Sequence, residues 1–263
     1  MEKTKVGIVS LGLIGGSILK GLWQKYEMFC YSTSSPENAF KYTKNISNNL
    51  DILKNCDIVF VCSPISKTLE ILNKLNSIVN SNCVVCDCAS VKGDLINQNF
   101  NYNFILSHPM AGKETSGFDE AEKDLFYKAK WLFEKENPLL LRLISDLGAI
   151  PLKIDMKEHD FMCAQISHLP TILACALFNC TENSSKKLAS SGFRDMTRLA
   201  STNSTLSFDM LKYNKKNILL AFDNLIKEFD NFKKLNDSEK INLLQNIASK
   251  RARMYDDNGK NIL

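Results

Sequence analysis

Two short segments carry side chains suited to proton transfer. The segment DCASVK places Ser90 directly after a run of apolar residues, and SHPMAGKE places His108 directly after another. A histidine titrates near neutral pH and can accept a proton from a hydroxyl group. Ser90 can hydrogen-bond to this histidine or to a substrate. The spacing is equally compatible with a structural histidine that precedes Pro109 in a turn.

A second group of candidate side chains lies in the later half of the chain. The segment QISHLP contains His168, and GFRDMTR contains Arg194 and Arg198. The two arginines are four residues apart and would share one face of a helix. A guanidinium group presents a planar fork that suits a carboxylate. The alternatives are a core histidine without a ligand and a surface ion pair between Arg194 and Asp195.

The segment KVGIVSLGLIGGSILKGL resembles a turn that binds a dinucleotide. In that fingerprint the second glycine lets the backbone approach the pyrophosphate, and the third lets helix and strand pack closely. Gly12 and Gly15 occupy these positions, whereas Ser10 replaces the first glycine. We expect a small residue to tolerate the turn with a negative φ. The pyrophosphate would then sit at the N-terminus of the following helix.

The end of the second predicted strand bears on the choice of cofactor. Dinucleotide folds that use NAD usually place an acidic residue there, which binds the ribose hydroxyls. Here the sequence is YSTSSPEN, so Ser32 and Thr33 offer hydroxyls and the first acid is Glu37. Hydroxyls accept the extra phosphate of NADP, whereas a carboxylate repels it. The segment favours NADP, with NAD possible, and an ordinary polar turn is the alternative.

The elements that must position these groups alternate between strand and helix. The predicted strands are 5–11, 28–32, 56–64, 82–90, 103–112 and 130–136, and the predicted helices are 15–25, 67–79 and 138–149. Strands that are apolar throughout and alternate with helices predict a doubly wound parallel sheet covered on both faces. Ligands bind beyond the carboxyl ends of such strands. We therefore predict a dinucleotide-binding domain over residues 1–155.

Only helical spacing follows, which predicts an all-helical domain over residues 156–263. The segments 219–235 and 239–255 are amphipathic. The most apolar segment, 161–178, approaches the length of a membrane span, but it contains Gln165, His168 and Pro170. We predict a buried helix there and no contact with a membrane.

Composition and charge narrow the class of protein. The 263 residues carry a formal net charge of +4 with mixed signs, which does not favour binding to nucleic acid. The nine cysteines lie mostly in apolar runs, and the N-terminal segment lacks a hydrophobic signal, so we expect reduced thiols and a cytoplasmic location. Cys83, Cys86 and Cys88, with His108, form a possible zinc site. Strand alternation points Cys83 away from the other two, so no metal is expected.

Taken together, the motifs resemble those of one enzyme family. GLIGGS, SPI, ASVK, HPMAG, ISHLP and SSGFRDMTR occur in the order found in prephenate and arogenate dehydrogenases of tyrosine biosynthesis. The sequence looks most like the short, NADP-using arogenate dehydrogenases of the cyanobacterial type. It departs from their pattern at Ser10 and in having no arginine beside Ser32. The resemblance implies arogenate or prephenate as substrate and a homodimer formed through the helical domain.

The resemblance also implies roles for individual residues. His108 matches the catalytic histidine and Ser90 the serine bonded to it and to the substrate hydroxyl. Arg198, His168 and Glu114 match residues that bind the substrate. The implied cofactor-binding residues are Gly12, Leu13, Ile14, Gly15, Ser32, Thr33, Ser63 and Pro64. The pair His159 and Asp160 matches a motif at the start of the helical domain, for which we expect a structural role.

Two other functions remain open at this level. One is a β-hydroxyacid-type dehydrogenase, which also joins a dinucleotide-binding domain to an all-helical one. These enzymes commonly use a catalytic lysine in the helical half, and ISHLP followed by GFRD argues against them. The other is a protein that senses NAD(P) without catalysis, in which Ser90, His108 and Arg198 would have no purpose.

Overall fold

The computed structural model describes residues 3–34 and 37–255. The contacts between Cα atoms divide the chain into two compact units, residues 1–218 and 219–263. The first unit contains every strand assigned in the described residues and the helices up to α8. The boundary proposed between residues 155 and 156 stays a prediction.

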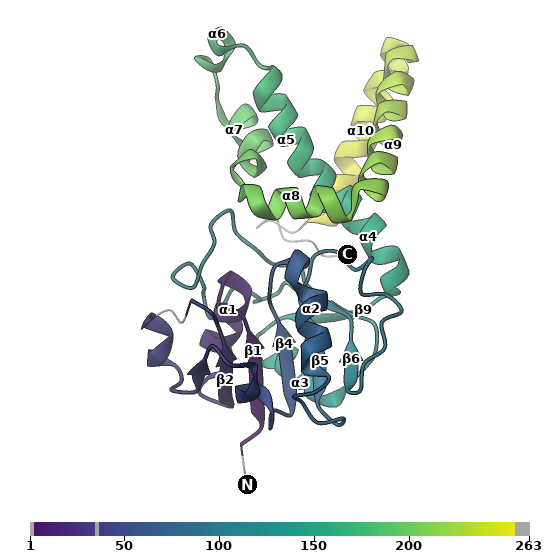
Figure 1. Ribbon diagram of the computed structural model, residues 1–263. Helices are drawn as coiled ribbons and strands as arrows, with labels where there is room; N and C mark the ends of the chain where they lie inside the picture. The colour runs from purple at the N-terminus through teal and green to yellow at the C-terminus, as the bar shows by residue number, and fades with distance from the viewer. Residues whose placement is uncertain (1–2, 35–36, 256–263) are drawn as a thin grey trace. The chain divides into compact units, whose positions relative to one another are not determined.

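The first unit is built on a six-stranded parallel sheet in the order β3-β2-β1-β4-β5-β6 (Figure 1). Its strands are β1 (Lys5–Val9), β2 (Glu27–Tyr31), β3 (Ile46–Ser47), β4 (Ile58–Val61), β5 (Val84–Asp87) and β6 (Asn103–Ile105). All four residues of β4 are buried, as expected for a central strand covered on both faces. The short edge strand β3 was not predicted from the sequence.

Helices cover both faces of this sheet. On one face, α1 (Leu13–Leu22) and α3 (Pro138–Asp146) contribute Ile18, Leu22 and Leu143 to a cluster with the strand residues Ile8 and Phe60. On the other face, α2 (Ile65–Leu75) contributes its buried leucines to a separate cluster. The predicted doubly wound arrangement is confirmed.

A second, three-stranded sheet departs from the prediction of a single parallel sheet. It has the order β7-β8-β9, with β7 (Ser107–Pro109) antiparallel and β9 (Ile150–Lys153) parallel to β8 (Lys130–Phe133). The segment 103–112, predicted as one strand, breaks between β6 and β7, so His108 lies within a strand and not after one. β9 was not predicted, and its residues are exposed. The pattern of apolar residues along a strand does not reveal which other strand it pairs with, so the second sheet could not be predicted from it.

Helices follow the second sheet within the first unit. They are α4 (Met156–Cys163), the π-helical turn η3 (Ala164–His168), α5 (Leu169–Cys180), α6 (Asn183–Lys186), α7 (Ser191–Thr197), the 3₁₀ turn η4 (Arg198–Ser201) and α8 (Ser204–Tyr213). Two 3₁₀ helices, η1 (Glu37–Lys41) and η2 (Leu50–Leu53), lie earlier in the chain. The prediction of helical structure after residue 155 is confirmed for this part.

The stretch Met156–Cys180 is apolar and long enough to cross a membrane, but only 33% of its most apolar window is buried inside the protein. Its first half supplies buried residues such as His159, Ala164 and Leu169, whereas Leu177 and Phe178 are exposed. The prediction of a buried helix therefore holds for the first half only. The same stretch carries His159, Asp160 and His168, all of which hydrogen-bond to other parts of the first unit.

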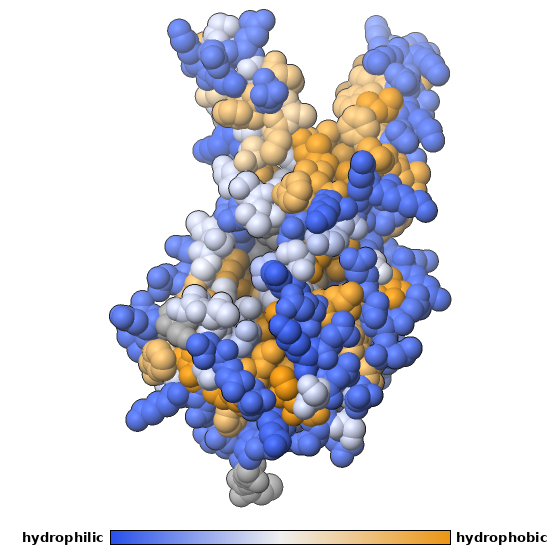
Figure 2. Space-filling view, in the orientation of Figure 1, coloured by the Kyte–Doolittle hydropathy of each residue, from blue (hydrophilic) through white to orange (hydrophobic). Residues whose placement is uncertain are grey.

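The remaining helices are α9 (Lys215–Lys234), which begins in the first unit, and α10 (Asp237–Met254), which lies in the second. A capping box formed by Asn236 and Glu239 starts α10. Both helices expose large apolar residues: Leu219, Leu220, Phe222, Ile226, Phe229, Phe232, Ile241, Leu244 and Ile247. Figure 2 shows apolar surface on the exposed helices α5 and α9. Such surface on a protomer is typical of a subunit interface.

Candidate active site

The turn between β1 and α1 requires an unusual backbone conformation at Ser10. Its φ is +73°, in the left-handed region that favours glycine. The prediction of a negative φ is therefore wrong. The amide of Ser10 donates to the carbonyl of Tyr31 at 2.8 Å, which ties the turn to the end of β2. A non-glycine residue in this conformation costs about 1–2 kcal/mol, which explains why a glycine is usual there.

The two remaining glycines of the turn are needed for different reasons. A Cβ atom at Gly15 would lie 2.0 Å from the carbonyl oxygen of Ser10, so no side chain fits. A Cβ atom at Gly12 would meet nothing within 4 Å, so that side of the turn is open to a ligand. The first turn of α1, with Leu13 and Ile14, has neither a side-chain cap nor an acidic residue. Its amide groups therefore suit an anion such as a pyrophosphate.

The other predicted cofactor residues lie at the carboxyl ends of the neighbouring strands. Ser32, directly after β2, is buried, and its Oγ lies 3.3 Å from that of Ser34. Thr33 is the next residue, and residues 35 and 36 lie outside the described residues. After β4, Ser63 Oγ lies 3.1 Å from Thr68 Oγ1 and Pro64 caps α2. These positions fit a dinucleotide laid along the strand ends.

His108 lies on β7, half buried, and its Nδ1 is 2.9 Å from Nε2 of His159. Burial lowers the pKa of His108 well below its usual value, and the nearby Lys92, His159 and His168 lower it further. The imidazole is therefore neutral at neutral pH and can accept a proton. Because Nδ1 faces His159, Nε2 is the nitrogen available to a substrate.

A buried ion pair fixes the strand that carries His108. Lys92 and Asp87 pair with their side chains fully buried, and Lys92 Nζ also donates to the carbonyl of Ser107 at 2.6 Å. Asp87 Oδ1 accepts from the amide of Ser107 at 3.0 Å. These bonds join the end of β5 to β7 across the gap between the two sheets. Lys92 was quoted in the sequence motif, but its structural role was not predicted.

Ser90 lies between Asp87 and Lys92 in this same loop. Its Oγ is buried, and it has no hydrogen-bond partner in the described part of the chain. A buried hydroxyl without a partner is rare and costs free energy. An unpartnered buried hydroxyl of this kind is expected for a serine that hydrogen-bonds to a cofactor or substrate.

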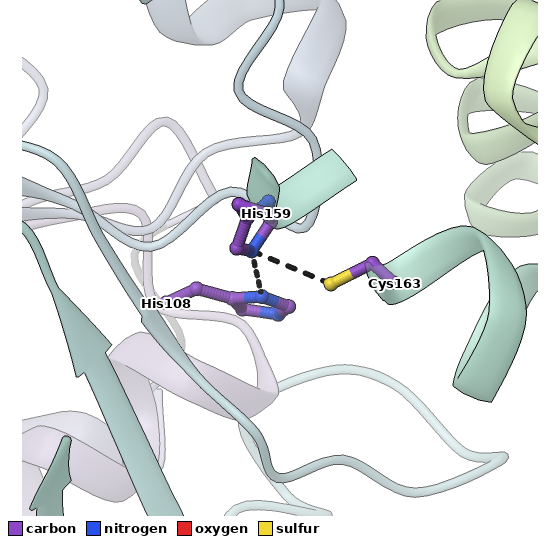
Figure 3. A group of neighbouring side chains, drawn as sticks. All are labelled: His108, His159 and Cys163. Carbon is purple, nitrogen blue, oxygen red and sulfur yellow. Dashed lines mark hydrogen bonds between the residues drawn. The ribbon is translucent and has the colours of Figure 1, made fainter. Parts of the chain in front are cut away.

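The pair His159 and Asp160 lies at the centre of a hydrogen-bonded network. Figure 3 draws the part of it in which His159 contacts His108. Asp160 accepts from the amides of Lys92 and Gly93 at 2.7 and 2.8 Å, and its Oδ1 lies 2.8 Å from Nδ1 of His159. We expected a purely structural role for His159 and Asp160, but His159 also contacts the candidate catalytic residue His108 directly. The sequence analysis identified the pair His159 and Asp160, but it did not predict the contact of His159 with His108.

His168 is buried and joins the same network through Asn214. The amide nitrogen of Asn214 lies 3.0 Å from His168 Nδ1 and donates to the carbonyl of Asp160 at 2.6 Å. Burial lowers the pKa of His168 to about 4. Asn214 follows α8 and was not identified from the sequence, in which a single asparagine between helices carries no distinguishing signal.

Arg198 forms an ion pair with Glu114, six residues beyond His108. The Arg198 side chain is 63% exposed and that of Glu114 35% exposed, so the guanidinium can reach a ligand from solvent. Arg194 pairs with Asp195 at 3.0 Å, as the alternative interpretation expected. Two predicted substrate-binding residues are thus in contact, although neither they nor Ser90 hydrogen-bond to His108 among the described residues.

The cysteines do not form the zinc site considered from the sequence. Cys86 and Cys88 pack in the core on one face of the sheet and Cys83 on the other, as strand alternation predicts. A different group does come together: ligand atoms of His108, His159 and Cys163 lie within 4.8 Å of one another (Figure 3). The spacing of these three residues along the chain does not suggest that they lie together.

The fold and the site together define a class of protein: dehydrogenases in which a nucleotide-binding sheet is followed by a helical part. A parallel sheet with a turn whose geometry suits a phosphate group precedes helices, and a neutral histidine lies on β7. Residues 32–146 match the family model of the prephenate dehydrogenase nucleotide-binding domain, and residues 155–249 match that of its dimerization domain. The first match begins after the glycine turn, so the role of that turn rests on its geometry.

Individual relatives agree with the family models. The chain is 32% identical over 245 residues to prephenate dehydrogenase of Lactococcus lactis subsp. cremoris (strain MG1363), covering 86% of this chain and 69% of that protein. The chain belongs to the prephenate dehydrogenase family. It is therefore a dehydrogenase with a nicotinamide nucleotide as its redox partner.

Two solved structures show the same architecture. Arogenate dehydrogenase of Synechocystis superposes with a TM-score of 0.81 at 29% identity, covering 94% of this chain and 99% of that one. Prephenate dehydrogenase of Aquifex aeolicus gives a TM-score of 0.83 at 25% identity, covering 94% and 98%. The predicted family and fold class are confirmed.

Proposed function

We propose that the protein oxidatively decarboxylates arogenate, prephenate or both, with transfer of a hydride to NAD(P)+, in tyrosine biosynthesis. The observation that carries this proposal is the neutral His108, whose Nδ1 is engaged by His159 so that Nε2 remains for a substrate. A substrate that loses a hydroxyl proton as hydride departs needs such a base. The relatives named prephenate and arogenate dehydrogenase support the same reaction.

The proton, the hydride and the carbon dioxide all leave from the substrate, and a bound nicotinamide would accept the hydride. Nε2 of His108 takes the proton of the ring hydroxyl as hydride leaves the same carbon. The bond between the ring and its carboxylate then breaks, its electron pair enters the ring, and carbon dioxide leaves. Because the ring becomes aromatic, the driving force comes from the substrate. The protein chiefly has to orient the ring and accept a proton.

Other side chains fit the remaining polar groups of such a substrate. Ser90 Oγ, which has no partner in the described residues, would bond to the ring hydroxyl. Arg198 has five donors, of which Glu114 uses only part, so it can bind a substrate carboxylate as well. His168 would donate to the substrate side chain. Glu114 would lie at the mouth of the site.

We also propose NADP as the preferred cofactor, with NAD possible, because Ser32 and Thr33 place hydroxyls and no carboxylate at the end of β2. We propose a homodimer formed through the helical part. The exposed apolar residues of α5, α9 and α10 and the match to a dimerization domain support it. The cytoplasm is the proposed location, with no role for nucleic acid, membrane or metal.

The test is an assay that crosses both substrates with both nicotinamide cofactors and follows the reduced nicotinamide by absorbance. We expect reduction with at least one of the two substrates, faster with NADP+. A panel of β-hydroxyacids serves as the control. Reduction with a β-hydroxyacid and with neither cyclohexadiene substrate would show that the proposed reaction is wrong.

A further inference from the structure

The chain contains three histidines, and all three lie in one hydrogen-bonded network. His108 and His168 have proposed contacts with substrate, but His159 has none. His159 is fully buried, so it touches neither solvent nor a ligand directly. Its two ring nitrogens are nevertheless both engaged, one with Asp160 and one with His108.

The donors and acceptors of Asp160 determine how His159 is protonated. Oδ1 accepts from the amide of Lys92 and Oδ2 accepts from the amide of Gly93. An ionised carboxylate is an acceptor only. The proton between Oδ1 and His159 must therefore reside on Nδ1 of His159. In a neutral imidazole the other nitrogen, Nε2, then carries a lone pair and no proton.

The state of His159 in turn fixes that of His108. Since His159 Nε2 can only accept, His108 Nδ1, which lies 2.9 Å away, must carry the proton and donate it. His108 Nε2 is then left with its lone pair toward the substrate. Asp160, His159 and His108 thus form a chain in which each group orients the next, as the acidic residue of a catalytic triad orients its histidine.

We propose that His159 and Asp160 are positioning residues that hold His108 in the Nδ1–H tautomer, the only neutral form whose Nε2 can accept the substrate proton. The proposal rests on the proposed role of His108 as the base. When His108 becomes cationic during turnover, its Nδ1–H bond to His159 strengthens and the carboxylate behind His159 helps to stabilise the charge.

A metal held by His108, His159 and Cys163 is a competing interpretation of the same cluster. Two nitrogens bound to one tetrahedral zinc at about 2.0–2.1 Å lie roughly 3.3 Å apart. The two nitrogens here are 2.9 Å apart, which is a hydrogen-bond distance. The Cys163 sulfur lies 3.4 Å from His159 Nε2 and burial raises the pKa of its thiol to about 12, so it stays protonated. The geometry therefore favours a proton chain over a metal.

The tautomers can be measured without an activity assay. The nitrogen chemical shifts of ring-¹⁵N-labelled histidines distinguish the Nδ1–H from the Nε2–H form. We expect His108 and His159 in the Nδ1–H form and His168 in the Nε2–H form, because Asn214 donates to Nδ1 of His168. Spectra of His108→Asn and His168→Asn assign the three signals. A wild-type His108 in the Nε2–H form would overturn the proposal.

Substitutions at His159 separate positioning from simple packing. In His159→Gln the side-chain oxygen replaces Nε2 as an acceptor, whereas His159→Leu removes the acceptor. We expect kcat to fall about 10- to 100-fold in His159→Leu with little change in KM, and to recover largely in His159→Gln. Cys163→Ala is the matched control, since it removes the other group at the same nitrogen and should leave kcat within about twofold.

The outcomes distinguish this proposal from the proposed function. If His108→Asn keeps wild-type kcat, the assignment of His108 as the base is wrong. If His108→Asn loses activity while a folded, cofactor-binding His159→Leu keeps wild-type kcat, the positioning role alone is wrong. Equal losses in His159→Gln and His159→Leu would also overturn it, because a purely steric role would not distinguish an acceptor from an alkyl group.

Discussion

The glycine-containing turn between β1 and α1 and the histidine network lie in the same compact unit, but they are assembled in different ways. The turn is made from consecutive residues, Ser10 to Gly15. Its geometry depends on the backbone conformation at Ser10 and on glycines, which carry no side chain. The network joins His108 to His159 across 51 residues and His168 to Asn214 across 46. A turn of consecutive residues can be recognised from residue spacing in the sequence. A hydrogen-bonded network between distant residues depends on which segments the fold brings together.

The two regions also differ in how they treat polar groups. The turn leaves the first amides of α1 without a side-chain cap, so that a ligand can use them. The network does the opposite: both oxygens of Asp160 and both nitrogens of His159 are engaged within the protein. We infer that the turn is built to bind, and that the network is built to hold one protonation state.

The largest expected effect comes from removing the base at the end of the network. His108→Asn should lower kcat about 10²- to 10⁴-fold, the usual contribution of general-base assistance. Cofactor affinity should not change, because the turn is untouched. Steady-state kinetics and a fluorescence titration with the nicotinamide cofactor measure the two effects. A parallel loss of cofactor affinity would mean that the two regions are not separable.

How far the sequence could predict each region follows from this difference. The glycine spacing predicted the turn and the helix that follows it, and only the sign of φ at Ser10 was wrong. The motif residues Arg198 and Glu114 were both identified, and the structure shows them in contact. By contrast, the break between β6 and β7 and the contact of His159 with His108 depend on strand pairing and packing between distant segments, which spacing does not encode.

Substitutions of the two glycines should separate folding from binding within the turn. Gly15→Ala places a methyl group against the Ser10 carbonyl, and we expect it to destabilise the protein by about 3 kcal/mol. Gly12→Ala has room in the free protein, so it should keep the melting temperature and lose cofactor affinity instead. Thermal unfolding and cofactor titration of both variants provide the measurements. An unchanged affinity in Gly12→Ala would argue against pyrophosphate at that position.

Acid should destabilise the network more than the turn. The pKa of His168 is about 4 in the folded protein, against about 6.5 in an unfolded chain. Between these values the unfolded chain binds more protons, so the stabilisation is complete above pH 6.5 and is lost as pH falls to 4. For His168 this amounts to about 3 kcal/mol, and the lowered pKa of His108 acts in the same direction.

Urea unfolding at several pH values between 7 and 4 measures this dependence. The control is His168→Asn, whose side-chain oxygen can still accept from Asn214 but does not titrate in this range. The stability of that variant should fall less steeply with acid than that of the wild type. Parallel curves would show that His168 is not buried in its neutral form.

Arg198→Ala tests the exposed ion pair between Arg198 and Glu114. We expect KM for the substrate to rise about 10- to 100-fold with a smaller effect on kcat, because a carboxylate ligand is lost rather than the base. Arg194→Ala is the matched control, since Arg194 is also exposed and forms an ion pair with its neighbour Asp195 on the same segment. Equal changes in the two variants would mean a general effect of charge and no specific carboxylate site.

The smallest expected effect concerns the strain stored in the turn. Ser10 adopts a left-handed conformation, which a serine tolerates less readily than a glycine does. Ser10→Gly relieves about 1–2 kcal/mol of strain but makes the unfolded chain more flexible, so the net gain should be about 0.5–1 kcal/mol. Ser10→Ala keeps the Cβ atom and should match the wild type. Urea unfolding of the three proteins measures the difference. A glycine variant no more stable than the alanine variant would mean that the left-handed conformation at position 10 costs no free energy.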